Sequence, residues 1–563
     1  MEKHPWLQHY PKTVPTAIDP DRYESLIGLF EECFARYQGL PMYENMGKVL
    51  LYREVDELSR AFAAYLQKYT HLQPGDHVAI QLPNLLQYPV ALLGILRAGM
   101  VVVNVNPLYT AHEMEHQLQD SKAKAIVLLA NFAHKLEKIL SKTAIKTTII
   151  TDVGDMLGSL KGPLVNFTVR HIKGLVPRYA LPQATAWKKV LQIGRQTKFH
   201  RINLCNDRTA FLQYTGGTTG VSKGAVLTHR NIVANIAQMT ACMRVKLQEK
   251  KETIITPLPL YHIFSLIVNL LAMMQLGAKN VLITNPKDIN SFVKELQKHR
   301  FTCISGVNTL FGALLAHKAF SSLDFSRLKT ALAGGVAVQK TVAEQWEKTT
   351  GTPLVEGYGL TETSPAVACN MLDGSHRIGT VGIPLPSTIV KIVNDSGMEV
   401  GSGVPGNLLV KGPQVMQTYW QQPAETAQIF ADGWLQTGDV AIMDHDGFIK
   451  IIDRKKEMIN VSGFNVYPNE IENVVGEHPM VLEVSAIGVP DQNGKEEVRL
   501  YIVKKKPQLT GEVLIAYCRE RLTGYKVPKQ VVFKDHLPKS NVGKILKRVL
   551  KEEAIGKTAN QTI

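Results

Sequence analysis

Long apolar runs are missing from this sequence of 563 residues. No stretch reaches the roughly 18 apolar residues that a membrane-spanning helix requires, because Arg97 and Asn269 interrupt the longest candidates, residues 91–105 and 264–274. Residues 1–6 also lack the apolar core of a secretory signal peptide. We therefore expect a cytoplasmic protein, and we expect any membrane contact to be peripheral, on the inner face of the cytoplasmic membrane.

Cysteine is scarce and scattered. The six cysteines form no Cys-x-x-Cys pair, and none stands near a cluster of histidines, so the common zinc-site spacings are excluded. We expect these residues to be buried thiols in a reducing compartment. Internal repeats, low-complexity tracts and Lys/Arg-rich blocks of the nucleic-acid-binding type were not found either, so we expect no nucleic-acid partner.

The net charge is positive. The chain has 64 Lys and Arg against 49 Asp and Glu, a balance of +15. Residues 453–563 hold 19 basic and 14 acidic residues, a local +5, which leaves +10 for the longer remainder. We interpret this excess as spread along the chain. Such a balance suits a phosphate-rich cofactor or lipid headgroups.

The length predicts more than one domain, because a single hydrophobic core stops growing well below this size. Helical patterns and short apolar strands alternate as far as about residue 375, which predicts layers of α/β structure. Short strands with many glycines and prolines then predict a small β subdomain at about 376–452. The expected strands are residues 101–103, 125–129, 389–393, 407–410 and 448–452.

A charged tetrapeptide, residues 453–456 (Asp-Arg-Lys-Lys), follows the last of these strands and is typical of a domain linker. Beyond it we expect a small α+β domain at 453–563. It should contain a helix beginning near Pro468, strands near 481–489 and 498–504, and a helix capped by Thr510.

A loop rich in glycine and threonine, residues 214–225, follows an apolar run at 209–213. Glycines let the backbone approach an anion, while hydroxyl and ammonium groups add donors, so the loop suits a triphosphate. It is not a Walker A loop, because Ser222 precedes Lys223 and Gly224 follows it. A flexible surface turn would explain such a loop equally well if it stood alone. Its residues are Tyr214, Thr215, Gly216, Gly217, Thr218, Thr219, Gly220, Val221, Ser222, Lys223, Gly224 and Ala225.

Four further motifs accompany this loop in a fixed order. They are residues 259–264 (Pro-Leu-Tyr-His-Ile-Phe), 356–363 (Glu-Gly-Tyr-Gly-Leu-Thr-Glu-Thr), 434–439 (Trp-Leu-Gln-Thr-Gly-Asp) together with 453–456, and 538–545 (Pro-Lys-Ser-Asn-Val-Gly-Lys-Ile). On these motifs the chain is identified as a member of the adenylate-forming superfamily of acyl-CoA synthetases, luciferases and peptide-synthetase adenylation domains. Residues 432–456 resemble the fatty acyl-CoA synthetase signature, and the resemblance to bacterial long-chain fatty acid–CoA ligases covers essentially the whole chain.

The resemblance implies a reaction in two halves. A fatty acid carboxylate attacks the α-phosphorus of ATP and releases pyrophosphate, and the thiol of coenzyme A then attacks the acyl-adenylate to give acyl-CoA and AMP. ATP, Mg²⁺ and coenzyme A are the implied cofactors. The resemblance also implies a large N-terminal domain at 1–452 and a mobile C-terminal lid at 453–563, which turns about a hinge at Asp453 between the two halves.

The resemblance implies that residues 215–224 hold the β- and γ-phosphates. Thr215 and Glu362 would coordinate Mg²⁺ through hard oxygen atoms, and Thr361 would donate to the α-phosphate. Taken in isolation, Glu362 would more simply form a surface salt bridge.

The resemblance places the nucleoside near Tyr358, whose aromatic ring would stack on adenine. Gly357 and Gly359 would let the nucleotide approach the backbone, Asp439 would accept both ribose hydroxyls, and Arg454 would add a donor there. Outside this context Tyr358 could equally be a core tyrosine.

Lys544 is implied to bridge the carboxylate and the α-phosphate during adenylation, although a solvated basic face would otherwise explain it. His262 would lie where the acyl and nucleotide sites meet, with a buried core histidine as the alternative. Ser462 and Gly463 would line the path of the pantetheine arm of coenzyme A.

The family places the wall of its apolar acyl tunnel at residues 306–315 and 333–336, which an ordinary core helix would explain equally well. The alternatives are a medium-chain or aryl acid–CoA ligase, and an adenylate-forming enzyme with another acceptor, such as a luciferase-like oxygenase or a carrier-loading module. A non-catalytic nucleotide or lipid sensor is a further alternative. The oligomeric state stays open.

Overall fold

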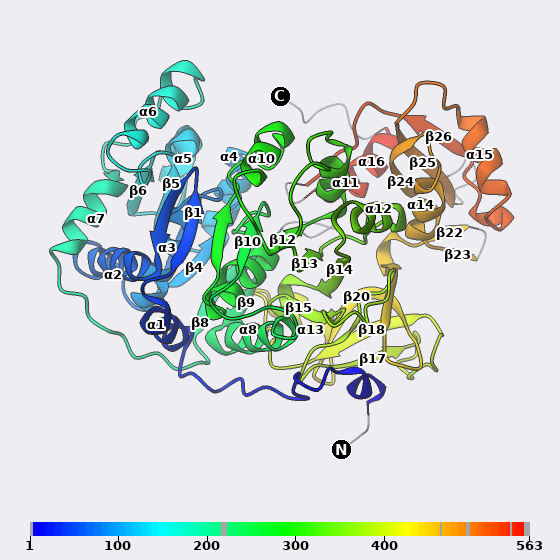
Figure 1. The fold of residues 1–563 in the computed structure, drawn as a ribbon, viewed down its shortest axis with the longest axis horizontal. Coiled ribbons are helices and arrows are strands. Elements are labelled where there is room, and N and C mark those ends of the chain that lie inside the picture. The colour runs from blue at the N-terminus through cyan, green and yellow to red at the C-terminus, as the bar shows by residue number, and fades with distance from the viewer. Residues whose placement is uncertain (1–3, 216–221, 462–463, 491–495, 541–542, 557–563) are drawn as a thin grey trace.

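The computed structural model describes residues 4–215, 222–461, 464–490, 496–540 and 543–556. Figure 1 shows two α/β regions side by side, a β-rich region below and to the right of them, and a small C-terminal region at the far right. Among the described residues, no helix combines the length and the apolar character needed to cross a bilayer. The mixed α/β class with a large N-terminal part and a smaller C-terminal part is confirmed.

The first sheet has seven strands in the order β7-β6-β5-β3-β4-β8-β9, and only the β8–β9 pair is antiparallel. Helices cover it, so strands such as β5 are buried at every position and consist of apolar residues. The strands are β3 (His77–Gln81), β4 (Val101–Asn104), β5 (Ala125–Leu129), β6 (Thr147–Thr151), β7 (Thr185–Ala186), β8 (Thr209–Thr215) and β9 (Lys223–Thr228).

The second sheet has nine strands in the order β16-β15-β14-β13-β12-β10-β11-β1-β2. Its strands from β14 to β1 are parallel, and antiparallel strands extend it at both ends. They are β1 (Pro41–Asn45), β2 (Lys48–Leu51), β10 (Thr253–Thr256), β11 (Lys279–Leu282), β12 (Cys303–Gly306), β13 (Thr330–Ala333), β14 (Leu354–Gly359), β15 (Ala366–Cys369) and β16 (Ile383–Pro384).

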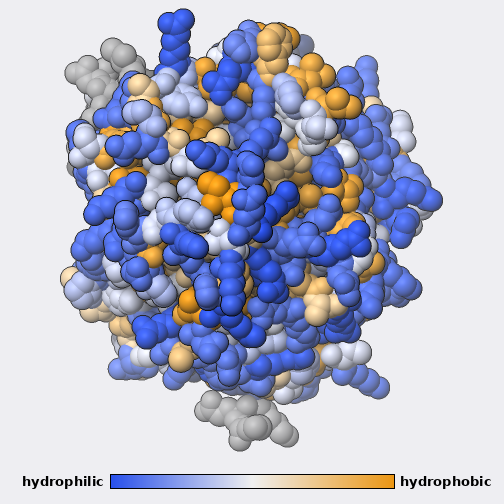
Figure 2. All heavy atoms as spheres, turned by 90° about the vertical axis from the view of Figure 1, so that its left-hand side faces the viewer, coloured by the Kyte–Doolittle hydropathy of each residue, from blue (hydrophilic) through white to orange (hydrophobic). Residues whose placement is uncertain are grey.

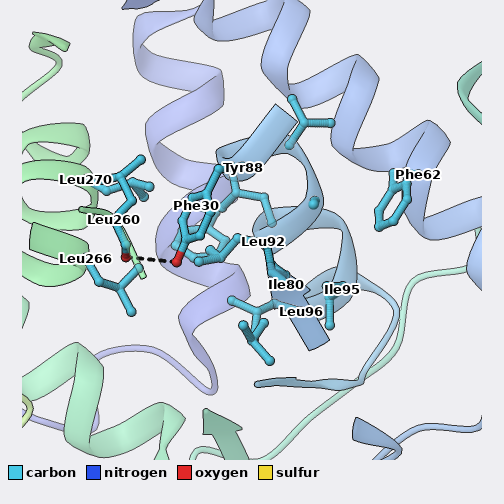
Figure 3. Packing of buried hydrophobic residues seen from close by; sticks show 14 of the residues in the cluster. Phe30, Phe62, Ile80, Tyr88, Leu92, Ile95, Leu96, Leu260, Leu266 and Leu270 are labelled. Carbon is cyan, nitrogen blue, oxygen red and sulfur yellow. Dashed lines mark hydrogen bonds between the residues drawn. The ribbon is translucent and has the colours of Figure 1, made fainter. Parts of the chain in front are cut away.

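The main core lies among α1 (Leu26–Tyr37), α2 (Tyr52–Tyr69), α3 (Gln87–Arg97), α7 (Trp187–Arg195), α8 (His229–Met243) and the π-helix η5 (Ser265–Ala272). Separate apolar clusters include α4 (Ala111–Asp120) on one hand and α10 (Ile289–Leu296), α11 (Asn308–Ala316) and α12 (Lys340–Thr350) on the other. Figure 3 shows Phe30, Ile80 and Leu92 packed around Tyr88. The Tyr88 hydroxyl lies 2.8 Å from the carbonyl oxygen of Leu260 and 2.7 Å from Asn104 Oδ1, so one buried polar group ties the two α/β regions together.

The β-rich region is an antiparallel sheet of β17 (Ile389–Val393), β18 (Gly406–Lys411), β19 (Phe430–Ala431), β20 (Trp434–Met443) and β21 (Ile449–Arg454). The expected strands at 389–393 and 407–410 lie in β17 and β18. The tetrapeptide interpreted as a linker is only partly a connection, because β21 continues through Asp453 and Arg454. Arg454 pairs there with Asp439 of β20, and residues 455–457 form a 3₁₀ turn.

The C-terminal part contains a three-stranded sheet of β24 (Val481–Pro490), β25 (Glu496–Lys504) and β26 (Gln530–Phe533). A two-stranded ribbon precedes it, formed by β22 (Ile459–Val461) and β23 (Phe464–Val466). Helices α14 (Pro468–Gly476), α15 (Gly511–Arg519) and α16 (Lys547–Ala554) complete it. The Thr510 side chain accepts from the backbone N–H of Val513, which confirms the expected helix cap.

The six cysteines are all free thiols, and five of them are buried as expected. Cys205 is exposed, so the expectation of burial was wrong for that residue. It lies in the connecting segment between α7 and β8.

Candidate active site

Three motif residues meet in the structure, Tyr358 from β14 and Asp439 and Arg454 from the paired strands β20 and β21. The Nε of Arg454 lies 2.7 Å from the Asp439 carboxylate, and the Tyr358 hydroxyl donates to the second carboxylate oxygen. The Asp439 side chain is almost fully buried. Burial, followed by the Asp439 charge, raises the pKa of Tyr358 far above its ordinary value, so its hydroxyl stays protonated and remains a donor. Sequence positions about 80 residues apart therefore form one hydrogen-bonded unit.

Glu362 lies in a 3₁₀ turn, Thr361–Thr363, directly after β14. Its Oε1 accepts from the Tyr419 hydroxyl at 2.5 Å, and its backbone carbonyl accepts from the N–H of Met416 at 2.8 Å. The segment that carries Tyr419 also bonds to β9, where the N–H of Trp420 donates to the Gly224 carbonyl at 2.7 Å. Thr361 and Glu362 are therefore held beside the β8–β9 hairpin.

That hairpin contains both ends of the glycine-rich loop. Tyr214 and Thr215 end β8, and Lys223, Gly224 and Ala225 begin β9. Ser222 directly precedes β9. The remaining loop residues lie outside the described residues: Gly216, Gly217, Thr218, Thr219, Gly220 and Val221.

The residues at the base of the hairpin make structural contacts. The Tyr214 hydroxyl donates to Asp120, and a Cβ on Gly224 would lie only 3.2 Å from the Tyr214 ring. Ala225 is fully buried, and Lys223 forms an ion pair with Glu425. The structure thus gives Tyr214 and Ala225 a role in packing the hairpin.

Lys544 reaches this group of residues from the C-terminal part. Lys544 is partly buried, and its pKa is lowered first by burial and then by the Arg454 charge, while the Asp439 carboxylate opposes the shift. Burial and the nearby Lys544 charge lower the pKa of the His262 imidazole to about 4. His262 is therefore neutral at pH 7 and lies within electrostatic reach of Lys544.

A tight turn presents Lys544. The backbone N–H of Lys544 donates to Ser540 Oγ at 3.1 Å, and the N–H of Ser540 donates to the Lys544 carbonyl at 2.7 Å. Gly543 has a φ of +81°, and a Cβ there would lie 2.8 Å from Thr309 Oγ1 and 3.1 Å from Val307 Cγ2. A glycine is required because the turn packs directly against the N-terminal part at the start of α11.

Asp453 is held by backbone donors from both sides of the junction. Its carboxylate accepts from the N–H of Arg454 at 2.7 Å and from that of Asn469 at 2.9 Å. Burial raises the pKa of this carboxyl, and the neighbouring Lys547 partly offsets the shift. Ser462 and Gly463 lie outside the described residues.

Sequence reasoning missed Glu356, the first residue of the 356–363 motif. Its carboxylate accepts from the backbone N–H of Val338 at 3.1 Å, yet burial raises its pKa to about 7. The only sequence signal was a carboxylate directly before Gly357. Tyr419, Glu425 and Asp120 were also missed, because they stand outside every motif and meet the site only through the fold.

The proposed tunnel wall lies in β12 and α11. Phe311 and Leu314 are fully buried in a cluster that includes Trp346, and the Phe311 ring approaches the position of a Cβ on Gly306 to 2.7 Å. These two side chains therefore belong to a core, which is the alternative left open above. Thr309 and Gly312 lie on other sides of α11 and are only partly buried. A tunnel wall at this helix remains a prediction.

Comparison with known proteins gives the family. The sequence profile of the AMP-binding enzymes matches residues 30–420, and that of the AMP-binding enzyme C-terminal domain matches residues 470–544. This chain belongs to the AMP-binding enzyme family. It is 56% identical over 559 residues to the long-chain-fatty-acid–CoA ligase of Escherichia coli O157:H7, with 99% of this chain and 100% of that protein covered.

More distant members cover the same length. The long-chain-fatty-acid–CoA ligase of Haemophilus influenzae is 50% identical, with 99% of each chain covered. Among solved structures, ATP-bound MatB from Rhodopseudomonas palustris superimposes with a TM-score of 0.80 at 27% identity, covering 94% of this chain and 99% of that one. The anthranilate CoA ligase AuaEII in complex with anthranoyl-AMP has a TM-score of 0.83 at 23% identity, covering 94% and 97%, a likeness of fold.

Proposed function

We propose that this protein is an AMP-forming long-chain fatty acid–CoA ligase. It would activate a long-chain fatty acid with ATP to an acyl-adenylate and pass the acyl group to coenzyme A, releasing pyrophosphate and then AMP. The full-length similarity to ligases of this name supports the proposal. The structural observation that supports it is the turn with Lys544, which belongs to the C-terminal part yet packs at Gly543 against Val307 and Thr309 of the N-terminal part. From there the Lys544 charge acts on His262, and the charges of Arg454 and Asp439 act on Lys544.

The first half-reaction requires two anions to meet. A carboxylate and a triphosphate repel each other, and a buried ammonium placed between them lowers that repulsion most where water is excluded. Lys544 would hold the fatty acid carboxylate against the α-phosphate, and Thr361 would donate to the same phosphate. His262, being neutral, would shape the junction of the acyl and nucleotide sites without adding charge.

Asp439 would orient the ribose. Arg454 and the Tyr358 hydroxyl fix its carboxylate, and a carboxylate has lone pairs for two more donors such as the ribose hydroxyls. The Tyr358 ring would lie against adenine, with Gly357 and Gly359 leaving the backbone open. Because one carboxylate links all three groups, nucleoside binding would be sensitive to its charge.

Residues Thr215 and Glu362 fit a Mg²⁺ site in their chemistry. They offer hydroxyl and carboxylate oxygens, the hard donors that this ion prefers, and few protein ligands are needed because Mg²⁺ keeps water and binds phosphates. Tyr419 orients the Glu362 carboxylate. When bound, the ion would offset the charge of the β- and γ-phosphates held by residues 215–224.

The second half-reaction would use the C-terminal domain in another orientation. We propose domains at 1–452 and 453–563 and a hinge at Asp453, where one carboxylate caps both Arg454 and Asn469. Turning there would remove Lys544 from the site and bring Ser462 and Gly463 toward the path of coenzyme A. We also propose a cytoplasmic protein that binds peripherally to the inner face of the cytoplasmic membrane.

Pyrophosphate release tests the activity. Purified protein with ATP, Mg²⁺ and palmitate should release a single burst of pyrophosphate. Addition of coenzyme A should convert this burst into steady turnover. Turnover across acids from C8 to C18 should rise with length, since each buried methylene contributes about 0.8 kcal/mol. A flat series would contradict the long tunnel, and preference for an aryl acid would contradict the proposed substrate.

A further inference from the structure

The charge excess of the N-terminal part is concentrated in one segment. Residues 156–206 contain nine Lys and Arg and no Asp or Glu, so this stretch accounts for +9 of the +10 in residues 1–452. The interpretation that the excess is spread along the chain was therefore wrong. Three of the nine cations form ion pairs with acidic residues outside the segment, namely Arg170 with Asp152, Lys188 with Asp155 and Arg201 with Glu31. The other six form an electrostatic footprint for an anionic partner.

The same segment exposes large apolar side chains. It contains helix α6 (Lys161–Phe167) and the π turn η4 (Thr168–Ile172), which continues it. In Figure 1 this helix projects at the upper left edge of the molecule. The exposed apolar residues are Leu160 (89% exposed), Leu164 (66%), Phe167 (56%), Ile172 (69%) and Leu175 (53%).

These residues follow a helical repeat. Leu160, Leu164 and Phe167 are spaced by four and three positions, so they form one stripe along the helix. His171 extends that stripe and contacts the Phe167 ring, with ring centroids 5.0 Å apart. Figure 2 views the molecule from the side where α6 and α7 lie, and hydrophobic spheres gather at the upper edge of a largely hydrophilic face.

The opposite side of the helix holds it to the protein. Asn166 Oδ1 accepts from the N–H of Gly154 at 2.6 Å, and the Arg170 guanidinium lies 3.0 Å from Asp152. Gly162 packs so closely on Gly154 that a Cβ on it would lie 2.5 Å from the Gly154 carbonyl oxygen. The helix is thus attached by polar and glycine contacts and by Val165, which packs against the main core, while its apolar stripe faces outward.

An exposed apolar stripe flanked by cations matches the chemistry of an anionic bilayer surface. Leucine and phenylalanine side chains enter the headgroup boundary, while lysine and arginine attract the phosphates of acidic lipids. Lys173 and Arg178 are exposed and follow the stripe, whereas Lys161 bonds to the Met46 carbonyl and Arg170 to Asp152. Residues 160–178 contain no acidic residue. A protein partner would not require this uniform sign of charge.

We propose that residues 160–178 are the docking surface through which this protein binds an anionic lipid bilayer. The proposal rests on the peripheral location stated above and identifies the surface responsible. It is independent of the ligase chemistry, because none of these residues belongs to the candidate active site.

Vesicle sedimentation of the full-length protein tests the surface. The wild type should bind vesicles of phosphatidylcholine mixed with phosphatidylglycerol at low salt, and bind phosphatidylcholine alone much more weakly. Leu164→Asp with Phe167→Asp should lower the partition coefficient about tenfold or more. Lys173→Gln with Arg178→Gln should lower it about 25-fold, since each cation near the surface is worth about fivefold.

A matched control is Met398→Asp with Val404→Asp, which changes two exposed apolar residues of the β-rich region (64% and 47% exposed). This control should bind vesicles as the wild type does. All variants should keep the wild-type ligation rate with a medium-chain acid in vesicle-free buffer, which excludes misfolding as the cause of lost binding.

Three results would overturn the proposal. Unchanged vesicle binding by the Leu164→Asp, Phe167→Asp variant would show that another surface docks. If the wild-type protein did not bind acidic vesicles, the proposed peripheral location would be overturned as well. If the Leu164→Asp, Phe167→Asp variant kept its lipid binding but lost a dimer that light scattering detects in the wild type, the stripe would be a contact between two copies of this chain. The ligase proposal is tested by a separate measurement, AMP formation in solution, so the two proposals can fail independently.

Discussion

Replacing Lys544 by alanine should separate the two half-reactions. Lys544 is partly buried, and its charge interacts with Asp439, Arg454 and His262, so solvent screens it less than it screens an exposed charge. Loss of one such contact to a transition-state anion costs roughly 3 to 4 kcal/mol, which is two to three decades in rate. Adenylate formation should fall by that factor.

The thioester half should survive the same change. If the C-terminal domain turns away for the second step, Lys544 no longer contacts the reacting atoms, so coenzyme A should still react with supplied acyl-adenylate at a near wild-type rate. The assays are pyrophosphate release from ATP with palmitate, and acyl-CoA formation from synthetic palmitoyl-adenylate.

Lys539→Ala is the matched control. Lys539 lies five residues earlier, and its ammonium pairs with Glu483 at a partly exposed site. An ion pair of this kind is worth about 0 to 1 kcal/mol, so both half-reactions should change less than about fivefold. Equal loss of both halves in folded Lys544→Ala protein would refute the reasoning.

Three further changes test other parts of the structure. Asp439→Asn should raise the KM for ATP by about one to two decades, because a charged hydrogen bond is worth about 1.5 to 3 kcal/mol; an unchanged KM would exclude contact with the ribose. Tyr88→Phe should destabilise the protein by about 1 to 2 kcal/mol in denaturant unfolding, since Asn104 Oδ1 and the Leu260 carbonyl oxygen lose the buried hydroxyl as a partner. Glu356→Gln should alter the pH dependence of the melting temperature. The folded pKa of Glu356, about 7, lies above its ordinary 4.5, so wild-type stability should fall by up to about 3 kcal/mol as the pH rises from 4.5 through 7. The stability of the Glu356→Gln variant should not fall in this way. Parallel curves of stability against pH for the two proteins would contradict the raised pKa of Glu356.

Much of the fold could be predicted from local pattern. Strand β5 is an unbroken apolar run, and Thr510 precedes a helical repeat, so periodicity and capping chemistry were sufficient for both. The tetrapeptide at 453–456 was harder, because its charges suggest a solvated linker. Pairing with β20 places Arg454 and Asp453 in a strand, and their partners in that pairing lie 15 and 13 positions away.

The candidate site was predictable only where a motif marks it. The glycine-rich loop and the turn with Lys544 carry distinctive spacing, so their residues could be named. Tyr419, Glu425 and Asp120 have no such signal, since their partners are 57, 202 and 94 positions away. The stripe on α6 was missed because apolar periodicity normally indicates a buried face. Only the exposed fractions reveal that it points outward.

The most direct test of the account is the product balance of the complete reaction. Purified protein given palmitate, ATP, Mg²⁺ and coenzyme A should form AMP and palmitoyl-CoA in equal amounts, with pyrophosphate appearing even when coenzyme A is withheld. Formation of ADP in place of AMP, or no nucleotide product at all, would contradict the account.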